Sequence, residues 1–286
     1  MKSYTFAAAM AAALSLFLTA APVAAQDTAP PRPVTVTGSV ALVSDYRFRG
    51  VSQSDEEMAI QGGLTIAHES GLYVGTWASN LAGWGTFGGA NMELDLIGGF
   101  KTPVGNGGTL DIGLTWYMYP GGASKTDFAE PYVKLSGTLG PATLLAGVAY
   151  APKQQALGNW YATGAAAQSG VYTRPGDKQD NLYLWGDAAA GIPSTPLTAK
   201  AHIGYSKGNP GLGPNGTSVA PTGKYWDWML GADLAVKGTP LTLGVAYVDT
   251  DIGRRESAYL LPNFSSTKDG GPIAGPQVVF SVTAAF

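Results

Sequence analysis

Acidic and basic side chains recur at every second position in several segments, and this spacing is the main chemical feature of the sequence. Asp45, Arg47 and Arg49 follow it, and so do Glu93 and Asp95. If such side chains face one shared interior, they form charged rings that set an ion preference. The residues that we predict to line this interior, as a pore, are Asp45, Arg47, Arg49, Trp77, Ser79, Glu93, Asp95, Asp111, Tyr117, Glu130, Lys134, Asp187, Lys200, His202, Asp227 and Asp233.

These interior residues could act in two ways. Acidic side chains outnumber basic ones among them, which would favour cations weakly. Alternatively, opposite charges could pair and fill the interior, because buried charges are normally paired. We expect one cluster near the outer mouth, in which Asp45, Arg47 and Arg49 face Glu93 and Asp95, and which could also form a constriction. Inward aromatic rings could stack on sugars or aromatic solutes, or simply pack the interior.

Residues that could carry catalysis are scarce. The chain has no cysteine and two histidines, His68 and His202. A barrel lipase would place its catalytic triad at the outer lipid edge, whereas His68 falls in a predicted short turn at the opposite rim. The G-x-G-x-x-G run at 211–216 contains Pro214 and is typical of a loop, not of a dinucleotide site. We therefore expect no enzyme, no catalytic or metal-binding residues and no cofactor.

Composition restricts the class of protein further. Charged residues make up 13% of the chain, about half of the roughly 25% found in ordinary soluble domains. The formal net charge is −3 and there is no long basic run, so we expect no nucleic-acid partner. Glycine contributes 40 of the 286 residues, and small side chains suit the inward face of a narrow barrel.

The elements that would position the charged residues are strands. Apolar residues alternate with polar or small ones in segments of roughly ten residues, which are separated by Gly, Pro, Asn and Ser. The predicted strands are 34–49, 58–67, 72–79, 91–101, 109–119, 128–137, 142–150, 181–190, 197–206, 224–236, 241–249 and 277–286.

The connections between these strands favour a membrane barrel over a soluble sandwich. Long and short connections alternate along the chain, as in outer-membrane barrels with an even number of strands. The few charges could not hydrate an outward polar face, so we place the apolar face toward lipid. The sequence therefore predicts an all-β protein, a transmembrane antiparallel β-barrel of about twelve strands in the outer membrane. The aromatics predicted to form its outer girdle are Tyr46, Phe48, Trp116, Tyr150, Tyr205, Trp226, Trp228 and Tyr247.

The two ends of the chain predict export. Lys2, an apolar stretch and a run of small residues ending at Ala25 are typical of a cleaved secretory signal peptide over residues 1–25. Residues 26–33 are Pro-rich and predict a periplasmic tether, and residues 34–286 form the barrel. The final strand ends in Phe286, which resembles the C-terminal signal that the barrel assembly machinery of Gram-negative bacteria reads.

One run of residues resembles a known family. Ser44-Asp45-Tyr46-Arg47-Phe48-Arg49-Gly50-Val51-Ser52-Gln53, followed by Trp77-Ala78-Ser79-Asn80 and Glu93-Leu94-Asp95, is similar to the TorF family of porins of Gram-negative bacteria. The resemblance is strongest over residues 36–150. It implies an outer-membrane channel, but it supplies neither a substrate nor catalytic residues.

We expect a porin-like channel for passive or weakly selective passage of small hydrophilic solutes. The alternative is a closed structural or adhesive barrel that binds outside partners through the long loops at 151–180 and 250–276. A third possibility is an enzyme of the outer leaflet. The expected surroundings are outer-membrane lipids and lipopolysaccharide, whose phosphates Arg254 and Arg255 could bind.

Overall fold

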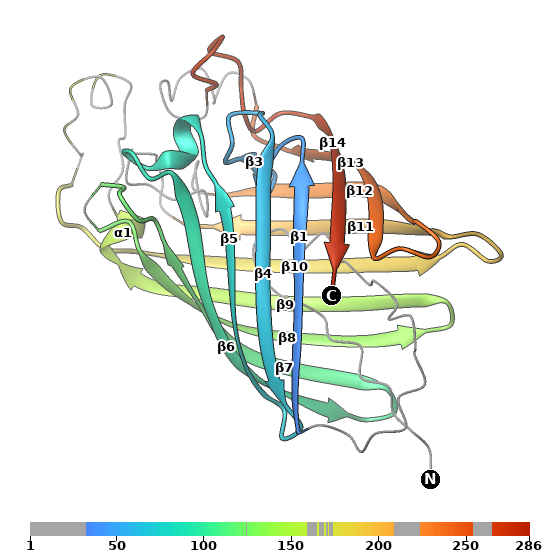
Figure 1. Cartoon of the computed structure of the whole chain (residues 1–286). Coiled ribbons are helices and arrows are strands. Elements are labelled where there is room, and N and C mark those ends of the chain that lie inside the picture. The colour runs from blue at the N-terminus through green and yellow to red at the C-terminus, as the bar shows by residue number, and fades with distance from the viewer. Residues whose placement is uncertain are drawn as a thin grey trace.

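The computed structural model describes residues 33–123, 125–158, 165, 169, 171, 174–208, 224–253 and 265–286 (Figure 1). The predicted signal peptide, and the tether up to residue 32, lie outside these residues. Arg254 and Arg255 lie outside them as well, as do parts of both long loops.

Twelve antiparallel strands close into one barrel, which confirms the predicted fold class and strand number. Each strand pairs with its neighbour in the chain, apart from the short β2 and β3, and β1 closes the ring against β14 (Figure 1). The barrel strands are β1 (Val34–Val43), β4 (Ala59–His68), β5 (Leu72–Asn80), β6 (Met92–Val104), β7 (Gly108–Met118), β8 (Phe128–Leu139), β9 (Ala142–Gln154), β10 (Gln179–Gly191), β11 (Leu197–Lys207), β12 (Lys224–Ala235), β13 (Leu241–Thr250) and β14 (Gln277–Ala285).

Strand β7 shows why these sequences form barrel walls. Ile112, Leu114 and Trp116 point outward and are 40–50% exposed, whereas Asp111 and Tyr117 point inward and are buried. Successive side chains of a strand lie on opposite faces, so the alternating sequence yields one apolar and one polar face. Closure then satisfies the backbone hydrogen bonds without water.

The outside of the barrel is apolar. Ile60, Leu230 and Phe280 are each at least 60% exposed, and many other aliphatic side chains lie beside them. Soluble monomers rarely expose so much contiguous apolar surface, whereas a bilayer requires it. Trp116, Tyr150, Trp226 and Tyr247 are exposed as predicted for the girdle, and Tyr205 and Trp228 are half-buried. Within the described residues, no helix is both long and apolar enough to cross a membrane.

The two rims of the barrel differ. At one rim, which we call the turn end, connections are short and glycines make the turns: Gly71 has φ +97°, and a Cβ there would lie 2.1 Å from the Lys101 carbonyl oxygen. The other rim, the loop end, carries the long connections. Phe286 lies near the turn end, where its backbone N–H and C=O bond to Gly38, and its side chain is 73% exposed. Its recognition by the assembly machinery stays a prediction.

The first predicted strand is wrong beyond Val43. Strand β1 ends there, and residues 44–58, which we call the inner loop, turn into the barrel and form a small hairpin of β2 (Arg47–Phe48) and β3 (Val51–Ser52). Residues 45–55 are all buried. Tyr46 and Phe48, predicted for the outer girdle, are each 2% exposed and face the interior instead.

The inner loop belongs to a packed core at the loop end. It includes Val51, Phe87, Leu157 and Ile273, which come from the inner loop, the connection with η1 (Gly83–Thr86), α1 (Gln155–Gly158) and the connection before β14. Phe87 packs edge-on against Tyr119, with ring centroids 4.7 Å apart. The loop end of the lumen is therefore filled by side chains from several connections.

Candidate functional site in the barrel lumen

The predicted interior residues all lie inside the barrel, buried or half-buried. Those on strands take the inward positions that the alternation assigns to them. Asp45, Arg47 and Arg49 reach the interior differently, because the inner loop carries them there. Whether these residues line a conducting pore stays a prediction.

Arg47 holds the inner loop together. Its Nε lies 2.6 Å from Asp45 Oδ2 and its Nη2 lies 3.0 Å from Glu56 Oε1, while Nη1 donates to the carbonyls of Gly50 and Gly275. Burial raises the pKa of Glu56, and the Arg47 guanidinium acts in the opposite direction. Every nitrogen of the guanidinium thus has a partner, which fixes the hairpin rigidly.

Arg49 anchors the inner loop to the barrel wall. Its Nη2 lies 2.7 Å from Glu130 Oε2 on β8, and its guanidinium lies 3.9 Å from the ring centroid of Tyr183 on β10. Burial alone would lower the pKa of Arg49, but the Glu130 carboxylate outweighs it and holds that pKa above the ordinary value. Tyr225 on β12 donates to the Arg49 carbonyl at 3.0 Å. The inner loop therefore crosses the lumen and contacts separate parts of the wall.

His202 lies near the middle of the lumen, between two carboxylates. Its Nδ1 is 2.6 Å from Asp187 Oδ1, and its Nε2 is 3.0 Å from Asp227 Oδ1. Tyr183 shares this cluster through its hydroxyl, 2.9 Å from His202 Nε2. A carboxylate at each ring nitrogen favours the imidazolium form, which donates from both. The cluster is therefore internally paired.

Near the turn end, two tyrosines cross two glycines. Four residues lie side by side across β5 to β8, in the order Tyr73, Gly99, Gly113 and Tyr132. The hydroxyls of the two tyrosines contact each other above the two glycines. A Cβ on Gly113 would lie 2.5 Å from the Tyr132 hydroxyl, so glycine is what permits this arrangement. Tyr73 also donates to Asp111 Oδ1 at 2.6 Å.

Two ion pairs lie toward the turn end, one between β7 and β8 and the other between β11 and β12. Lys134 Nζ lies 3.2 Å from Asp111 Oδ2, and Lys200 Nζ lies 2.6 Å from Asp233 Oδ1. Each pair joins neighbouring strands. Asp111 faces Lys134 in register on β7 and β8, and Lys200 and Asp233 come from the paired strands β11 and β12. These cations and carboxylates therefore compensate one another locally.

Glu93 and Asp95 differ from the other interior acids. Tyr46 donates to Glu93 Oε2 at 3.1 Å, but Glu93 Oε1 and both Asp95 oxygens are buried without a hydrogen-bond partner. Burial, followed by the Glu93 charge, raises the pKa of Tyr46 well above its ordinary value, so its hydroxyl stays protonated. The expected pairing of Glu93 and Asp95 with the arginines is wrong, because Arg47 and Arg49 bind other carboxylates.

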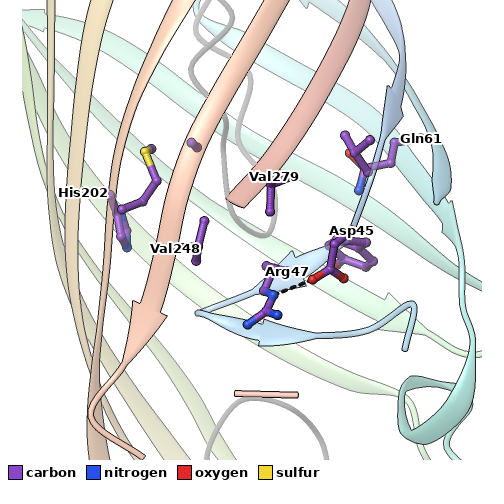
Figure 2. A pocket seen from close by; sticks show the side chains of 10 residues that line it. Asp45, Arg47, Gln61, His202, Val248 and Val279 are labelled. Atoms are coloured by element: carbon purple, nitrogen blue, oxygen red, sulfur yellow. Dashed lines mark hydrogen bonds and ion pairs between the residues drawn. The ribbon is translucent and has the colours of Figure 1, made fainter. Parts of the chain in front are cut away.

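A small cavity lies against the inner loop. Asp45 and Arg47 bound one side, and Gln61, His202 and Val279 lie around it on the barrel wall (Figure 2). Its volume is about 30 Å³, more than the roughly 10–15 Å³ that a cavity needs to hold one water molecule. The inner loop thus leaves a small cavity between itself and the barrel wall at this level.

Sequence reasoning missed the inner loop and the glycine-tyrosine crossing. One signal was present: Ser44 and Gly50 interrupt the apolar face that the first strand would otherwise continue.

Within the described residues, no three His, Asp or Glu side chains come together to hold a metal ion.

Comparisons with known proteins agree with this architecture. The family described as "Bacterial protein of unknown function (Gcw_chp)" matches residues 27–286. No curated protein matches the chain in sequence. The NanC porin structure is 12% identical, with a TM-score of 0.51 over 88% of this chain and 99% of that one. An outer-membrane channel from Pseudomonas putida F1 is 9% identical, with a TM-score of 0.41 over 90% and 97%. The likeness to NanC shows a shared fold.

Proposed function

Because the chain belongs to the Gcw_chp family of bacterial proteins of unknown function, and because it folds as a porin-like barrel, we propose that it is a channel for small hydrophilic solutes. An apolar exterior on a closed bacterial barrel places it in the outer membrane. The proposed mature protein starts at residue 26, after the signal peptide. The TorF resemblance supports the same function and stays a prediction.

The observation that carries this proposal is the charged inner wall. Charged side chains extend from Glu93 near the loop end, through His202, to Asp111 and Asp233 near the turn end. Desolvated charges are costly, and apolar packing often stabilises a core at least as well. A barrel that served only as a scaffold would have little use for such a wall, whereas a hydrophilic solute requires one.

The inner loop sets the size of solute. It crosses the lumen and leaves a cavity of only about 30 Å³ beside it. Ions and the smallest polar molecules fit such a constriction, and larger solutes would require the inner loop to move. We therefore propose a narrow channel with passive passage.

The test is single-channel conductance of the refolded protein, residues 26–286, in a planar bilayer. We expect small, discrete conductance steps, because the constriction admits only ions and small solutes. Insertion is checked separately by protease protection in liposomes. A barrel that inserts but never conducts would refute the channel.

The packed loop end favours one alternative. The core there joins the inner loop to three other connections and buries Val51, Phe87 and Ile273 almost completely. Such a mouth would also suit a closed barrel that presents its outer loops to a partner. The same recording separates the two functions, since a closed barrel gives no steps. We propose no enzymatic role.

A further inference from the structure

The interior acids fall into two groups. Within the described residues, all the predicted pore-lining acids other than Glu93 and Asp95 have a basic partner within 4 Å. These pairs are Asp45 with Arg47, Glu130 with Arg49, Asp111 with Lys134, Asp233 with Lys200, and both Asp187 and Asp227 with His202. Glu93 and Asp95 have none, although they are 1% and 0% exposed. The described part of the lumen thus contains one place where two neighbouring acids have no basic partner.

The register places Asp95 between two aromatic rings. On β6 it faces Trp77 of β5 on one side and Tyr117 of β7 on the other. Side chains directly opposite on adjacent strands have Cβ atoms about 5 Å apart, so both rings lie beside the carboxylate. Glu93 lies two positions before Asp95 on the same face of β6. It faces Ser79 and accepts a hydrogen bond from the Tyr46 hydroxyl of the inner loop.

Neighbouring acids alone would not make a binding site, but Asp95 adds a second observation. Its side chain is fully buried, and neither oxygen has a hydrogen-bond partner. A buried carboxylate without a partner is strongly unfavourable, so it must take up a cation or a proton. Aromatic rings attract cations, and the rings of Tyr46 and Trp77 pack together beside the two acids, with centroids 5.2 Å apart.

We propose that Glu93 and Asp95 form a binding position for a monovalent cation, which makes the channel cation-selective. A divalent ion is disfavoured, since it requires six or more oxygen ligands and no third acid joins the pair to form a metal site among the described residues. The position lies in the loop half of the lumen beside the inner loop, whose Tyr46 bonds to Glu93. A carboxylate there adds negative charge next to the segment that crosses the lumen. This inference rests on the proposed channel function.

The test is the reversal potential across a bilayer that separates two KCl concentrations. The wild-type channel is expected to pass K⁺ in preference to Cl⁻. In the Glu93→Gln/Asp95→Asn variant, the K⁺ to Cl⁻ permeability ratio is expected to fall by roughly tenfold, the effect of removing two charges close to the path. The matched control is Glu69→Gln/Asp180→Asn, which removes one Glu and one Asp outside the lumen and should leave the ratio unchanged.

The possible outcomes separate this inference from the channel itself. If the Glu93→Gln/Asp95→Asn variant conducts with an unchanged K⁺ to Cl⁻ permeability ratio, the cation position is overturned and the channel function stands. A wild-type channel that does not prefer K⁺ overturns the cation position as well. A protein that inserts but never conducts overturns both proposals. A lower K⁺ to Cl⁻ permeability ratio in the Glu93→Gln/Asp95→Asn variant, but not in the control, supports both proposals.

Discussion

The loop half and the turn half of the lumen have the same alternating strands but different interiors. In the loop half, the inner loop and neighbouring connections pack into a core in which Val51, Phe87 and Ile273 are 0–1% exposed. In the turn half, inward residues of β1 and β4 such as Ser39, Gly63 and Thr65 are only half-buried. The strands define a barrel wide enough to be hollow, and the inner loop decides where it is closed.

This difference separates two roles. The small side chains of β1 and β4 keep the turn half wide, while the loop half combines the inner loop with two acids that have no basic partner. Selectivity and size limit should therefore depend on the loop half, and the turn half should contribute mainly to barrel stability. Each prediction below tests this division of roles.

Removing the inner loop should have the largest effect. Val43 and Ala59 pair in register, so a tight Asn-Gly hairpin turn can replace residues 44–58 without stretching β1 or β4. We expect the conductance step to rise on the order of tenfold, because the segment that crosses the lumen is then gone. Planar-bilayer recording measures this. An unchanged step, with the barrel intact by circular dichroism, would show that the inner loop does not limit passage.

Breaking the anchor of the inner loop should have the next largest effect. Arg49→Ala leaves the buried Glu130 without its cation, which costs about 3 kcal/mol of unfolding free energy. Lys101→Ala is the matched control in the turn half, because Lys101 lies 4.0 Å from Asp111 with 28% of its side chain exposed. Its loss should cost less than about 1 kcal/mol. Urea unfolding in detergent, monitored by tryptophan fluorescence, gives the free energy of unfolding of both variants. Equal losses of that free energy would contradict the difference between the two halves.

The turn half follows from the sequence far better than the loop half. Alternation placed Asp111, Lys134 and Lys200 on the inward face because strand period is a local property. The inner loop depends on contacts between distant segments, such as Arg47 with the Gly275 carbonyl, and no local period reports them. Alternation also continues by chance through Asp45, Tyr46 and Arg47, so the chain resembles a longer strand. The partners of each charge likewise depend on where the inner loop lies.

A glycine in the turn half should give the smallest effect. Gly113→Ala places a methyl group against the Tyr132 hydroxyl and the Gly98 carbonyl, both within 2.7 Å of the new Cβ. The tyrosine must move, and the hydroxyl contact between Tyr73 and Tyr132 is lost. Overpacking of this kind costs about 1–2 kcal/mol. The same urea titration measures the loss, and the conductance step should stay the same because the constriction lies elsewhere.

Gly137→Ala is the control for this substitution. Gly137 lies on β8 like Tyr132, but the nearest atom to its Cβ would be 3.6 Å away, an ordinary contact. Replacing a glycine at a compatible position stabilises by up to about 1 kcal/mol, because the unfolded chain loses freedom. Opposite signs for the two alanines would mean that the barrel wall is tightly fitted at the Tyr73–Tyr132 crossing and not at Gly137. A drop in conductance for Gly113→Ala would instead assign part of the constriction to the turn half.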